Sequence, residues 1–158
     1  MKEIFIPNYG KLILKNVIFD LNGTLQYKGK ISEEVINKIE QLKQIYNVYL
    51  VSADNRGNLK ELAKKLNTSY IKINPKDITE AEAKNNELIK LNKNNTVVVG
   101  NGNNDALMLK NAVIGITVLG EEGATIRSIL NSDVVVPNPV SALDFLLDEK
   151  IMIGTLRS

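Results

Sequence analysis

The sequence of 158 residues contains no cysteine, no histidine and no tryptophan. Without cysteine, disulfide bonds and thiolate chemistry are excluded. Without histidine, Ser-His and Cys-His nucleophilic sites and the usual zinc sites are excluded as well. Any catalysis must therefore use carboxylates, lysine, hydroxyl groups, asparagine, backbone amides and a hard metal ion.

A dominant charge of one sign and a rich supply of aromatic side chains are also lacking. The 20 Lys and Arg residues nearly balance the 18 Asp and Glu residues, and aromatic residues are 5% of the chain. This balance disfavours nucleic-acid binding. No apolar run approaches the roughly 18 residues of a membrane span, and residues 1–7 lack the apolar segment of a signal peptide. We therefore expect a cytoplasmic protein that binds neither nucleic acid nor membrane.

What is present is ordinary globular composition, with 44% hydrophobic and 24% charged residues. This length and composition fit one domain with one core. We expect a single domain over residues 1–158, with its core fold over residues 17–147.

The hydrophobic pattern alternates between strands and helices. Residues 3–6 and 11–14 flank a Pro-Asn-Tyr-Gly turn and predict an N-terminal β-hairpin over residues 3–14. Further strands are predicted over 17–19, 48–51, 70–73, 96–99, 113–118 and 134–136. Helices are predicted from Ser32 to about residue 45, and over 59–66, 79–91, 105–110, 122–130 and 141–147; residues 150–158 are expected to form a tail or a last strand. The alternation predicts a doubly wound, Rossmann-like α/β fold, with a parallel sheet and helices on both faces.

Polar residues gather where the predicted strands end. Asp20 follows the first central strand, Ser52 follows the next, and Gly100–Asp105 follows the run of valines. Lys84 lies in the helix between the last two of these strands. Because ligands of such folds bind beyond the carboxyl ends of the strands, we expect these residues to form the site.

The chemistry of this set fits phosphoryl transfer through an aspartyl-phosphate. A carboxylate at the end of a buried strand, here Asp20, is a preorganised nucleophile. Backbone amides of the following loop can surround phosphate oxygens, and these are the amides of Asn22, Gly23 and Thr24.

Neutral and positive donors complete the expected phosphate site. The hydroxyls of Thr24 and Ser52 can donate hydrogen bonds, and Lys84 supplies positive charge and restrains the nucleophile. Mg²⁺ would offset the repulsion between two anions, and it prefers oxygen ligands. The oxygens available to it belong to Asp20, the Asn22 carbonyl and the loop from Asn101 to Asp105.

At these residues the sequence resembles the haloacid dehalogenase superfamily of phosphohydrolases. Phe19-Asp20-Leu21-Asn22-Gly23-Thr24 is similar to the first motif of that family, an apolar strand followed by D-x-D-G-T. Ser52, Lys84 and Gly100-Asn101-Gly102-Asn103-Asn104-Asp105 resemble the second, third and fourth motifs in the same order. Segments 106–109 and 132–135 look most like the phosphorylation domain of P-type ATPases.

The resemblance implies a Mg²⁺-dependent phosphohydrolase of the soluble, P-type-ATPase-like group. Its substrate would be a phosphorylated small molecule or a phosphoprotein. Segments 26–46 and 53–84 have no room for the cap domains of many relatives, so the resemblance implies a capless member. An open face of this kind suits a macromolecular partner or a second copy of the chain.

Two positions depart from the family pattern. The family's phosphatases place an aspartate two residues after the nucleophile, where it protonates the leaving group and then activates water; Asn22 can do neither. Loss of a general acid–base group costs about 10²–10⁴-fold in rate, so we expect slow turnover and a preference for good leaving groups, such as those of aryl phosphates, acyl phosphates or anhydrides. The metal-binding aspartate of the fourth motif is Asn101, and Asp105 is the acidic residue that remains to bind Mg²⁺, directly or through water.

Several residues keep an alternative interpretation. Lys76 competes with Lys84 as the motif lysine, and Ser52 also fits an ordinary capping serine. Asp54 fits a place in the pocket as well as a place outside it. Glu121-Glu122-Gly123 is interpreted as a helix start.

Two function classes follow. The first is the phosphohydrolase, and the second is a catalytically weak or inactive phosphate- and Mg²⁺-binding regulatory module that acts through a protein partner. A response-regulator receiver would need an acidic pair after its first strand, and the segment from Asp20 to Thr24 does not supply one.

Overall fold

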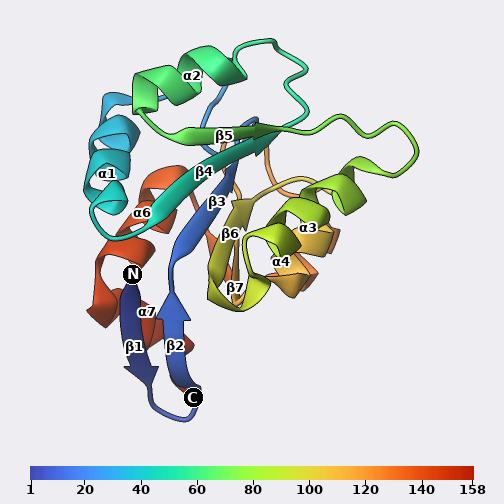
Figure 1. Ribbon diagram of the computed structural model, residues 1–158. Helices are drawn as coiled ribbons and strands as arrows, with labels where there is room; N and C mark the ends of the chain where they lie inside the picture. Colours follow the sequence, from blue (N-terminus) through green and yellow to red (C-terminus); the bar gives the residue numbers. More distant parts are fainter.

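The computed structural model describes all residues, 1–158, and contains a six-stranded parallel sheet and a separate two-stranded hairpin (Figure 1). The strand order of the large sheet is β5-β4-β3-β6-β7-β8, with β3 and β6 at its centre. The strands are β1 (Lys2–Ile6), β2 (Gly10–Leu14), β3 (Asn16–Asp20), β4 (Asn47–Ser52), β5 (Ser69–Lys72), β6 (Thr96–Gly100), β7 (Ile114–Val118) and β8 (Val134–Val136).

Helices cover both faces of this sheet. They are α1 (Glu33–Lys43), α2 (Leu59–Leu66), α3 (Glu80–Lys90), the short 3₁₀ helix η1 (Lys93–Asn95), α4 (Ala106–Asn111), α5 (Ile126–Leu130), α6 (Pro139–Leu147) and α7 (Glu149–Leu156). Val17 and Phe19 of β3 share a core with α1, α2 and α6, while Ile18 shares a core with α3 and α4. The predicted doubly wound α/β fold is confirmed.

The central strands are apolar throughout because both of their faces are covered. Every residue of β3, β6 and β7 is buried. In the parallel register Asp20 pairs with Val51, and Phe19 pairs with Val99. The residues that follow β3, β4 and β6 therefore meet at one edge of the sheet, as the sequence predicts.

Local signals at two helix starts explain where the helices that flank the site begin. The Ser32 side chain accepts a hydrogen bond from the Val35 amide at the start of α1. At α3, Thr79 and Glu82 form a reciprocal capping box. This box fixes the helix that carries Lys84.

The structure corrects two predicted elements. Helix α5 begins after Thr125, whose side chain caps it, so the interpretation of Glu121–Gly123 as a helix start is wrong. Gly123 has a φ of +77°, and the Thr125 amide donates to the Asn101 carbonyl, which ties this loop to the site. Residues 149–156 form helix α7 and not a tail or strand, because Met152 is fully buried on the core.

The predicted hairpin is present at the amino end of β3, away from the polar edge (Figure 1). Ile4, Ile6, Leu12 and Leu14 are buried in the same core as the sheet. Residues 21–32 contain only turns and isolated bridges, and a single helix and strand stand between β4 and α3, so the fold has no cap domain. None of the helices combines the length and apolar character that crossing a membrane requires.

Candidate active site at the carboxyl ends of the strands

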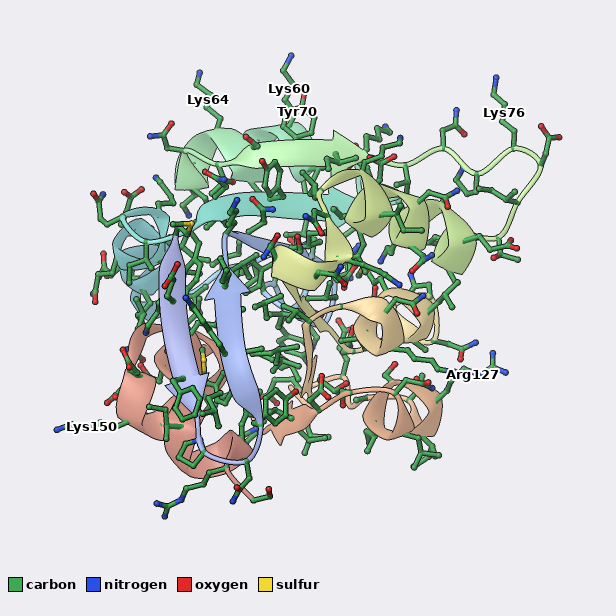
Figure 2. All side chains as sticks on the ribbon, turned by 60° about the horizontal axis from the view of Figure 1, so that its bottom comes forward. Lys60, Lys64, Tyr70, Lys76, Arg127 and Lys150 are labelled. Carbon is green, nitrogen blue, oxygen red and sulfur yellow. The ribbon has the colours of Figure 1, made fainter.

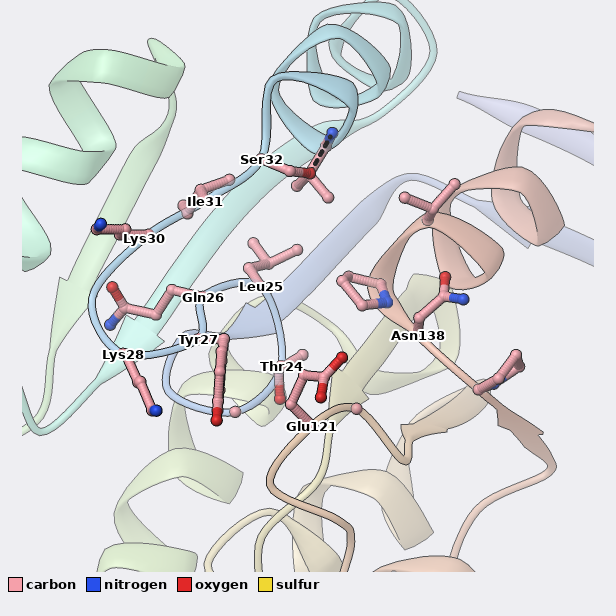
Figure 3. A pocket seen from close by; sticks show the side chains of 16 residues that line it. Thr24, Leu25, Gln26, Tyr27, Lys28, Lys30, Ile31, Ser32, Glu121 and Asn138 are labelled. Atoms are coloured by element: carbon pink, nitrogen blue, oxygen red, sulfur yellow. Dashed lines mark hydrogen bonds between the residues drawn. The ribbon is translucent and has the colours of Figure 1, made fainter.

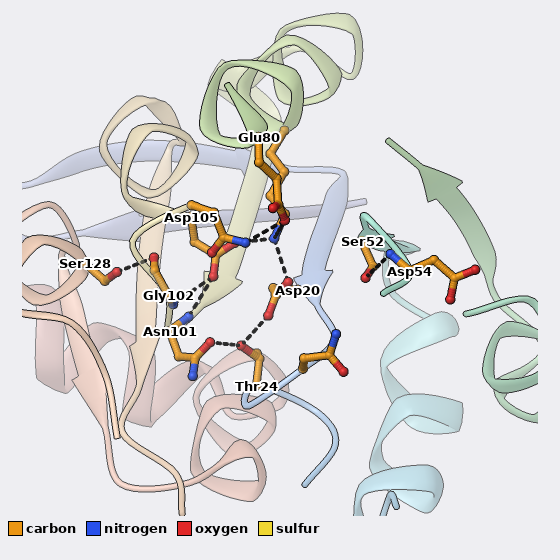
Figure 4. Close-up of polar contacts among 12 residues, drawn as sticks. Asp20, Thr24, Ser52, Asp54, Glu80, Asn101, Gly102, Asp105 and Ser128 are labelled. Carbon is orange, nitrogen blue, oxygen red and sulfur yellow. Dashed lines mark hydrogen bonds and ion pairs between the residues drawn. The ribbon is translucent and has the colours of Figure 1, made fainter. Parts of the chain in front are cut away.

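Asp20 lies at the end of β3 with both carboxylate oxygens engaged (Figure 4). Lys84 Nζ donates to Asp20 Oδ1 at 2.6 Å, and Thr24 Oγ1 lies 3.1 Å from Asp20 Oδ2. Asp20 is only 5% exposed and is therefore almost completely shielded from solvent. Such a carboxylate has one orientation, which is what a nucleophile in line with a phosphorus atom requires.

Lys84 is the lysine of this site. Its side chain is 1% exposed, and its Nζ lies 2.7 Å from Asp105 Oδ1 as well as 2.6 Å from Asp20 Oδ1. Glu80 of the same helix lies 3.8 Å away. Lys76 instead stands on the exposed loop before α3 and points outward in Figure 2. The structure thus places Lys84, and not Lys76, beside Asp20.

Two buried carboxylates share this one ammonium group. Burial, followed by the nearby Asp105 carboxylate, raises the pKa of Asp20 from 3.8 to about 7, although Lys84 works in the opposite direction. Burial disfavours the charge on Lys84, but Asp20 and Asp105 outweigh it and raise the pKa of the ammonium group above its usual value. Lys84 is therefore positively charged throughout the physiological range, and Asp20 is costly to ionise.

The loop from Gly100 to Asp105 is folded around the Asp105 carboxylate. Asp105 Oδ2 accepts hydrogen bonds from the backbone amides of Asn101 and Gly102, at 3.0 and 2.9 Å. With Lys84 on Oδ1, both oxygens of Asp105 are occupied. A Cβ atom at Gly100 would lie 2.7 Å from the Asp105 Cβ, so this loop requires glycine there. Asp105 acts on the site through Lys84 and the loop.

The oxygens that face Thr24 fit a divalent cation. Thr24 Oγ1 lies 3.1 Å from Asp20 Oδ2 and 3.3 Å from Asn101 Oδ1, yet the hydroxyl has one proton for two acceptors. The Asn22 carbonyl accepts no hydrogen bond within the protein. These are hard oxygen donors of the kind that Mg²⁺ prefers. The structure contains no group of three or more His, Cys, Asp or Glu side chains suited to a metal, so the ligand set is poor in carboxylates.

The expected phosphate donors are divided between free and engaged groups. Ser52 is 3% exposed, and its Oγ accepts from the Asp54 amide at 2.9 Å, which leaves the hydroxyl proton without an acceptor. The backbone amides of Asn22 and Thr24 also lack an acceptor. The Gly23 amide donates to the Gln26 carbonyl at 2.9 Å and is engaged.

Gly23 contributes by its shape. Its φ is +78°, and a Cβ atom there would lie 2.4 Å from Asn101 Nδ2 and 2.9 Å from Glu122 Oε2. Only glycine therefore lets the loop after β3 approach Asn101 and the segment before α5 so closely.

Asp54 has a role outside the pocket. Its Oδ1 accepts from the Leu59 amide at 2.9 Å, and its Oδ2 pairs with Lys72 at 3.1 Å. The residue therefore braces the loop between β4 and α2, in a left-handed conformation with a φ of +60°.

Sequence reasoning missed the residues that surround Asn22. Asn22 Oδ1 accepts hydrogen bonds from Gln26 Nε2 at 2.6 Å and from Arg56 Nε at 3.1 Å. Asn58 Nδ2 in turn donates to Gln26 Oε1 at 3.1 Å. Arg56 follows the carboxyl end of β4, and that position was the only signal that could have identified it.

A pocket of about 810 Å³ adjoins this site (Figure 3). It lies between the segment from Gly23 to Val35, the loop at residues 120–121, and residues 137–140 at the start of α6. Tyr27, Lys28, Lys30, Glu121 and Asn138 are among its lining residues. Because Gly23 and Thr24 belong to its wall, the pocket opens beside the loop that follows Asp20.

No protein-family model matches the chain. In sequence, the chain is 51% identical over 72 residues to the uncharacterized protein MJ0073 of Methanocaldococcus jannaschii, and the match covers 45% of this chain and 77% of that protein.

Solved structures of phosphatases share the fold. The cobalt-bound deoxy-D-mannose-octulosonate 8-phosphate phosphatase of Haemophilus influenzae has a TM-score of 0.68 and 18% identity, over 87% of this chain and 89% of that chain. The 3-deoxy-D-manno-octulosonate 8-phosphate phosphatase of Moraxella catarrhalis, in complex with magnesium ion, phosphate ion and KDO, has a TM-score of 0.68 and 16% identity, over 91% and 94%. A phospho-aspartyl intermediate analogue of phosphoserine phosphatase has a TM-score of 0.66 and 18% identity, over 86% and 100%.

At identities this low, the structural likeness establishes the fold alone. The chain belongs to the same family as the Methanocaldococcus jannaschii protein, and its fold is that of the haloacid dehalogenase superfamily of phosphatases.

Proposed function

We propose that this chain is a Mg²⁺-dependent phosphohydrolase that works through a phosphorylated Asp20. The observation that supports it most strongly is the buried Asp20 carboxylate at the end of β3, which Lys84 holds at 2.6 Å while the nearby Ser52 hydroxyl proton has no acceptor. A fixed nucleophile with positive charge and unused donors around it is the arrangement that phosphoryl transfer requires.

In the first step an oxygen of Asp20 attacks the phosphorus atom, and the bond from phosphorus to the leaving group breaks. Lys84 stays charged and restrains the attacking carboxylate. The Ser52 hydroxyl and the free amides of Asn22 and Thr24 donate to the phosphoryl oxygens. In the second step water attacks phosphorus, the bond to Asp20 breaks, and phosphate leaves with the regenerated carboxylate.

The residues that would hold Mg²⁺ are Asp20, the Asn22 carbonyl and Asn101. Asp105 would position them through its hydrogen bonds to Lys84 and to the Asn101 amide. A bound Mg²⁺ would supply positive charge between the nucleophile and the anionic phosphoryl group. Because Asn101 has replaced a carboxylate, we expect weak Mg²⁺ binding.

Turnover is expected to be slow and to depend on the leaving group. Asn22 cannot donate a proton, so a leaving group must depart as an anion. The open face accommodates a phosphorylated small molecule or a phosphoprotein, and it leaves room for self-association.

The alternative is a regulatory module that binds phosphate and Mg²⁺ without efficient turnover. One observation favours it: Asn22 and Asn101 are both amides, with side-chain oxygens that already accept hydrogen bonds from Gln26, Arg56 and Thr24. In that case the phosphorylated or liganded state would be recognised by a protein partner.

The first test is hydrolysis of para-nitrophenyl phosphate at high enzyme concentration. Native chain and Asp20→Asn are compared, each with Mg²⁺ and with EDTA. Activity that needs both Mg²⁺ and Asp20 supports the phosphohydrolase. Activity no higher than that of Asp20→Asn, with acetyl phosphate as well as with para-nitrophenyl phosphate, contradicts it and favours the regulatory module.

A further inference from the structure

The side-chain amide of Asn22 is held in one orientation by its neighbours. Its oxygen accepts two hydrogen bonds, from Gln26 Nε2 at 2.6 Å and from Arg56 Nε at 3.1 Å. Its nitrogen has no acceptor within the protein. An amide whose oxygen is occupied in this way must present its two N–H donors on the opposite side.

The buried side chain of Gln26 fixes the orientation of the Asn22 amide. Gln26 is 2% exposed, and its own oxygen accepts from Asn58 Nδ2 at 3.1 Å. The amides of Asn58, Gln26 and Asn22 are therefore aligned in one direction, each donating to the next. A flip of Asn22 would set donor against donor at Gln26, so the aligned chain resists it.

Arg56 adds a second set of free donors at the same place. Its Nε is committed to Asn22, while its two terminal nitrogens have no acceptor and no carboxylate within ion-pair distance. A guanidinium group presents paired N–H donors that match the oxygens of a carboxylate or a phosphate. Because Arg56 Nε donates to Asn22 Oδ1, the guanidinium group lies next to the Asn22 amide.

These donors lie on one side of the nucleophile. In Figure 4, Ser52 stands on the β4 side of Asp20, and Asn101 and Asp105 stand on the other side. Arg56 belongs to the loop that follows β4. Lys84, Asp105 and Thr24 are buried on the β6 side, whereas Arg56 is exposed, so the β4 side is open to solvent.

We infer that Asn22 and Arg56 form a receptor for an oxyanion leaving group, and that the substrates of this site are anhydrides of phosphoric acid, either acyl phosphates or pyrophosphates. This rests on the proposed function. Asn22 supplies hydrogen bonds in place of a proton, and Arg56 supplies charge and selects leaving groups with at least two oxygens.

The chemistry balances without a general acid. For an acyl phosphate, Asp20 forms a bond to phosphorus, the bond from phosphorus to the acyl oxygen breaks, and the electron pair leaves with a carboxylate that needs no proton. Water then attacks phosphorus, the bond to Asp20 breaks, and one dihydrogen phosphate ion leaves. The sum is acyl phosphate dianion plus water giving carboxylate and dihydrogen phosphate.

An aryl or alkyl phosphate uses this receptor poorly. Its leaving oxygen is single and carries a carbon group, so it cannot occupy the paired donors of a guanidinium group. An alkoxide also needs a proton that Asn22 cannot provide. Leaving-group geometry, and not leaving-group pKa alone, therefore sets the selectivity.

The test compares three substrates on native chain, Arg56→Ala, Arg56→Lys and Arg127→Ala. The substrates are acetyl phosphate, inorganic pyrophosphate and para-nitrophenyl phosphate. Arg127 is a matched control, because its side chain makes no hydrogen bond or ion pair and lies on α5. Loss of a charge-assisted hydrogen bond predicts a roughly 10- to 100-fold drop in kcat/KM of Arg56→Ala for the anhydrides, and less than about threefold for para-nitrophenyl phosphate.

The outcomes show which kind of anhydride the site uses and whether Arg56 contributes to its selectivity. A selective loss on acetyl phosphate alone assigns acyl phosphates, and a loss on pyrophosphate alone assigns pyrophosphates. Equal losses on all three substrates, or equal losses in Arg127→Ala, overturn the receptor. Partial recovery in Arg56→Lys supports it, since charge returns without the paired geometry.

A binding measurement covers the case in which turnover is absent. Pyrophosphate is titrated into Asp20→Asn, and into Asp20→Asn that also carries Arg56→Ala, by calorimetry with Mg²⁺ present. Weaker binding after loss of Arg56 supports the receptor even if the native chain hydrolyses nothing, which would overturn only the proposed function. Equal binding by both chains overturns the receptor.

Discussion

The two sides of Asp20 are built differently. On the β6 side, Lys84, Asp105 and Thr24 are buried, and the oxygens of both carboxylates are engaged. On the β4 side, the Ser52 hydroxyl and the nitrogens of Asn22 and Arg56 have hydrogens with no acceptor within the protein. The β6 side, called the closed side below, has carboxylate oxygens that accept hydrogen bonds within the protein. The β4 side, called the open side, has donors without an acceptor in the protein.

Under the proposed function, this difference separates the residues that hold the nucleophile from those that receive the substrate. Buried polar groups in folded proteins are normally paired, so the closed side behaves as part of the structural core. Unused donors that are fixed by their neighbours are the preorganised groups that stabilise an incoming or departing anion. The comparison predicts that substitutions on the closed side act on stability, whereas substitutions on the open side act on rate and selectivity.

The largest effect is expected from breaking the closed side with Lys84→Met. Removal of the ammonium leaves Asp20 and Asp105 buried side by side without a counter-charge. The free energy of unfolding should fall by about 3–5 kcal/mol, as for other broken buried pairs. Urea unfolding measures it, with Lys76→Met on the exposed loop as the control. An equal change in the two variants would show that the shared ammonium does not hold the site together.

The next effect is expected from giving the open side a proton donor, with Asn22→Asp. A general acid–base group should raise hydrolysis of an alkyl phosphate by about 10²–10⁴-fold. Acetyl phosphate should gain much less, because acetate leaves without a proton. Steady-state rates on the two substrates measure the contrast. No gain with the alkyl phosphate would mean that another step limits turnover.

A smaller effect is expected from Ser52→Ala. Its hydroxyl proton should donate to a phosphoryl oxygen, so kcat/KM should fall roughly tenfold or more. The fold should be little affected, since the hydroxyl oxygen accepts only one bond, from the Asp54 amide. Ser52→Thr restores the hydroxyl and should recover activity. An unchanged rate in Ser52→Ala would assign Ser52 to loop structure alone.

The last effect concerns how the stability of the chain depends on pH. Burial and Asp105 raise the pKa of Asp20 to about 7 in the folded chain. A raised carboxyl pKa gives stability that is present at low pH and is lost as pH rises through the folded value. In EDTA, Asp20→Asn should therefore melt above the native chain at about pH 8, and the difference should shrink toward about pH 4. A difference that grows on acidification would contradict the shift.

Much of the fold could be predicted from local pattern. The buried strands are runs of apolar residues, and Ser32 and Thr79 are side-chain caps at the predicted helix starts. Helix α7 was not predicted, because it is stabilised by tertiary packing on the core, where Met152 is fully buried. The late start of α5 also has a tertiary cause, since Thr125 is bonded to Asn101 across the site.

The site was predictable where a motif fixed it and not where contacts cross between loops. Asp20 and Lys84 meet as the sequence predicts, and the geometry separates Lys84 from Lys76. The engagement of the Gly23 amide depends on how the loop after β3 turns back on itself. Arg56 and Gln26 meet at Asn22 only because the loops after β3 and β4 are neighbours in space.

The most direct measurement is the intact mass of the chain after brief treatment with acetyl phosphate and Mg²⁺, followed by peptide mapping. Because Asn22 cannot activate water, the phosphorylated state should persist long enough to be seen. A phosphoryl group on the peptide that contains Asp20, absent from Asp20→Asn, is the predicted result. Hydrolysis without any such adduct, or an equal adduct on Asp20→Asn, would contradict the account.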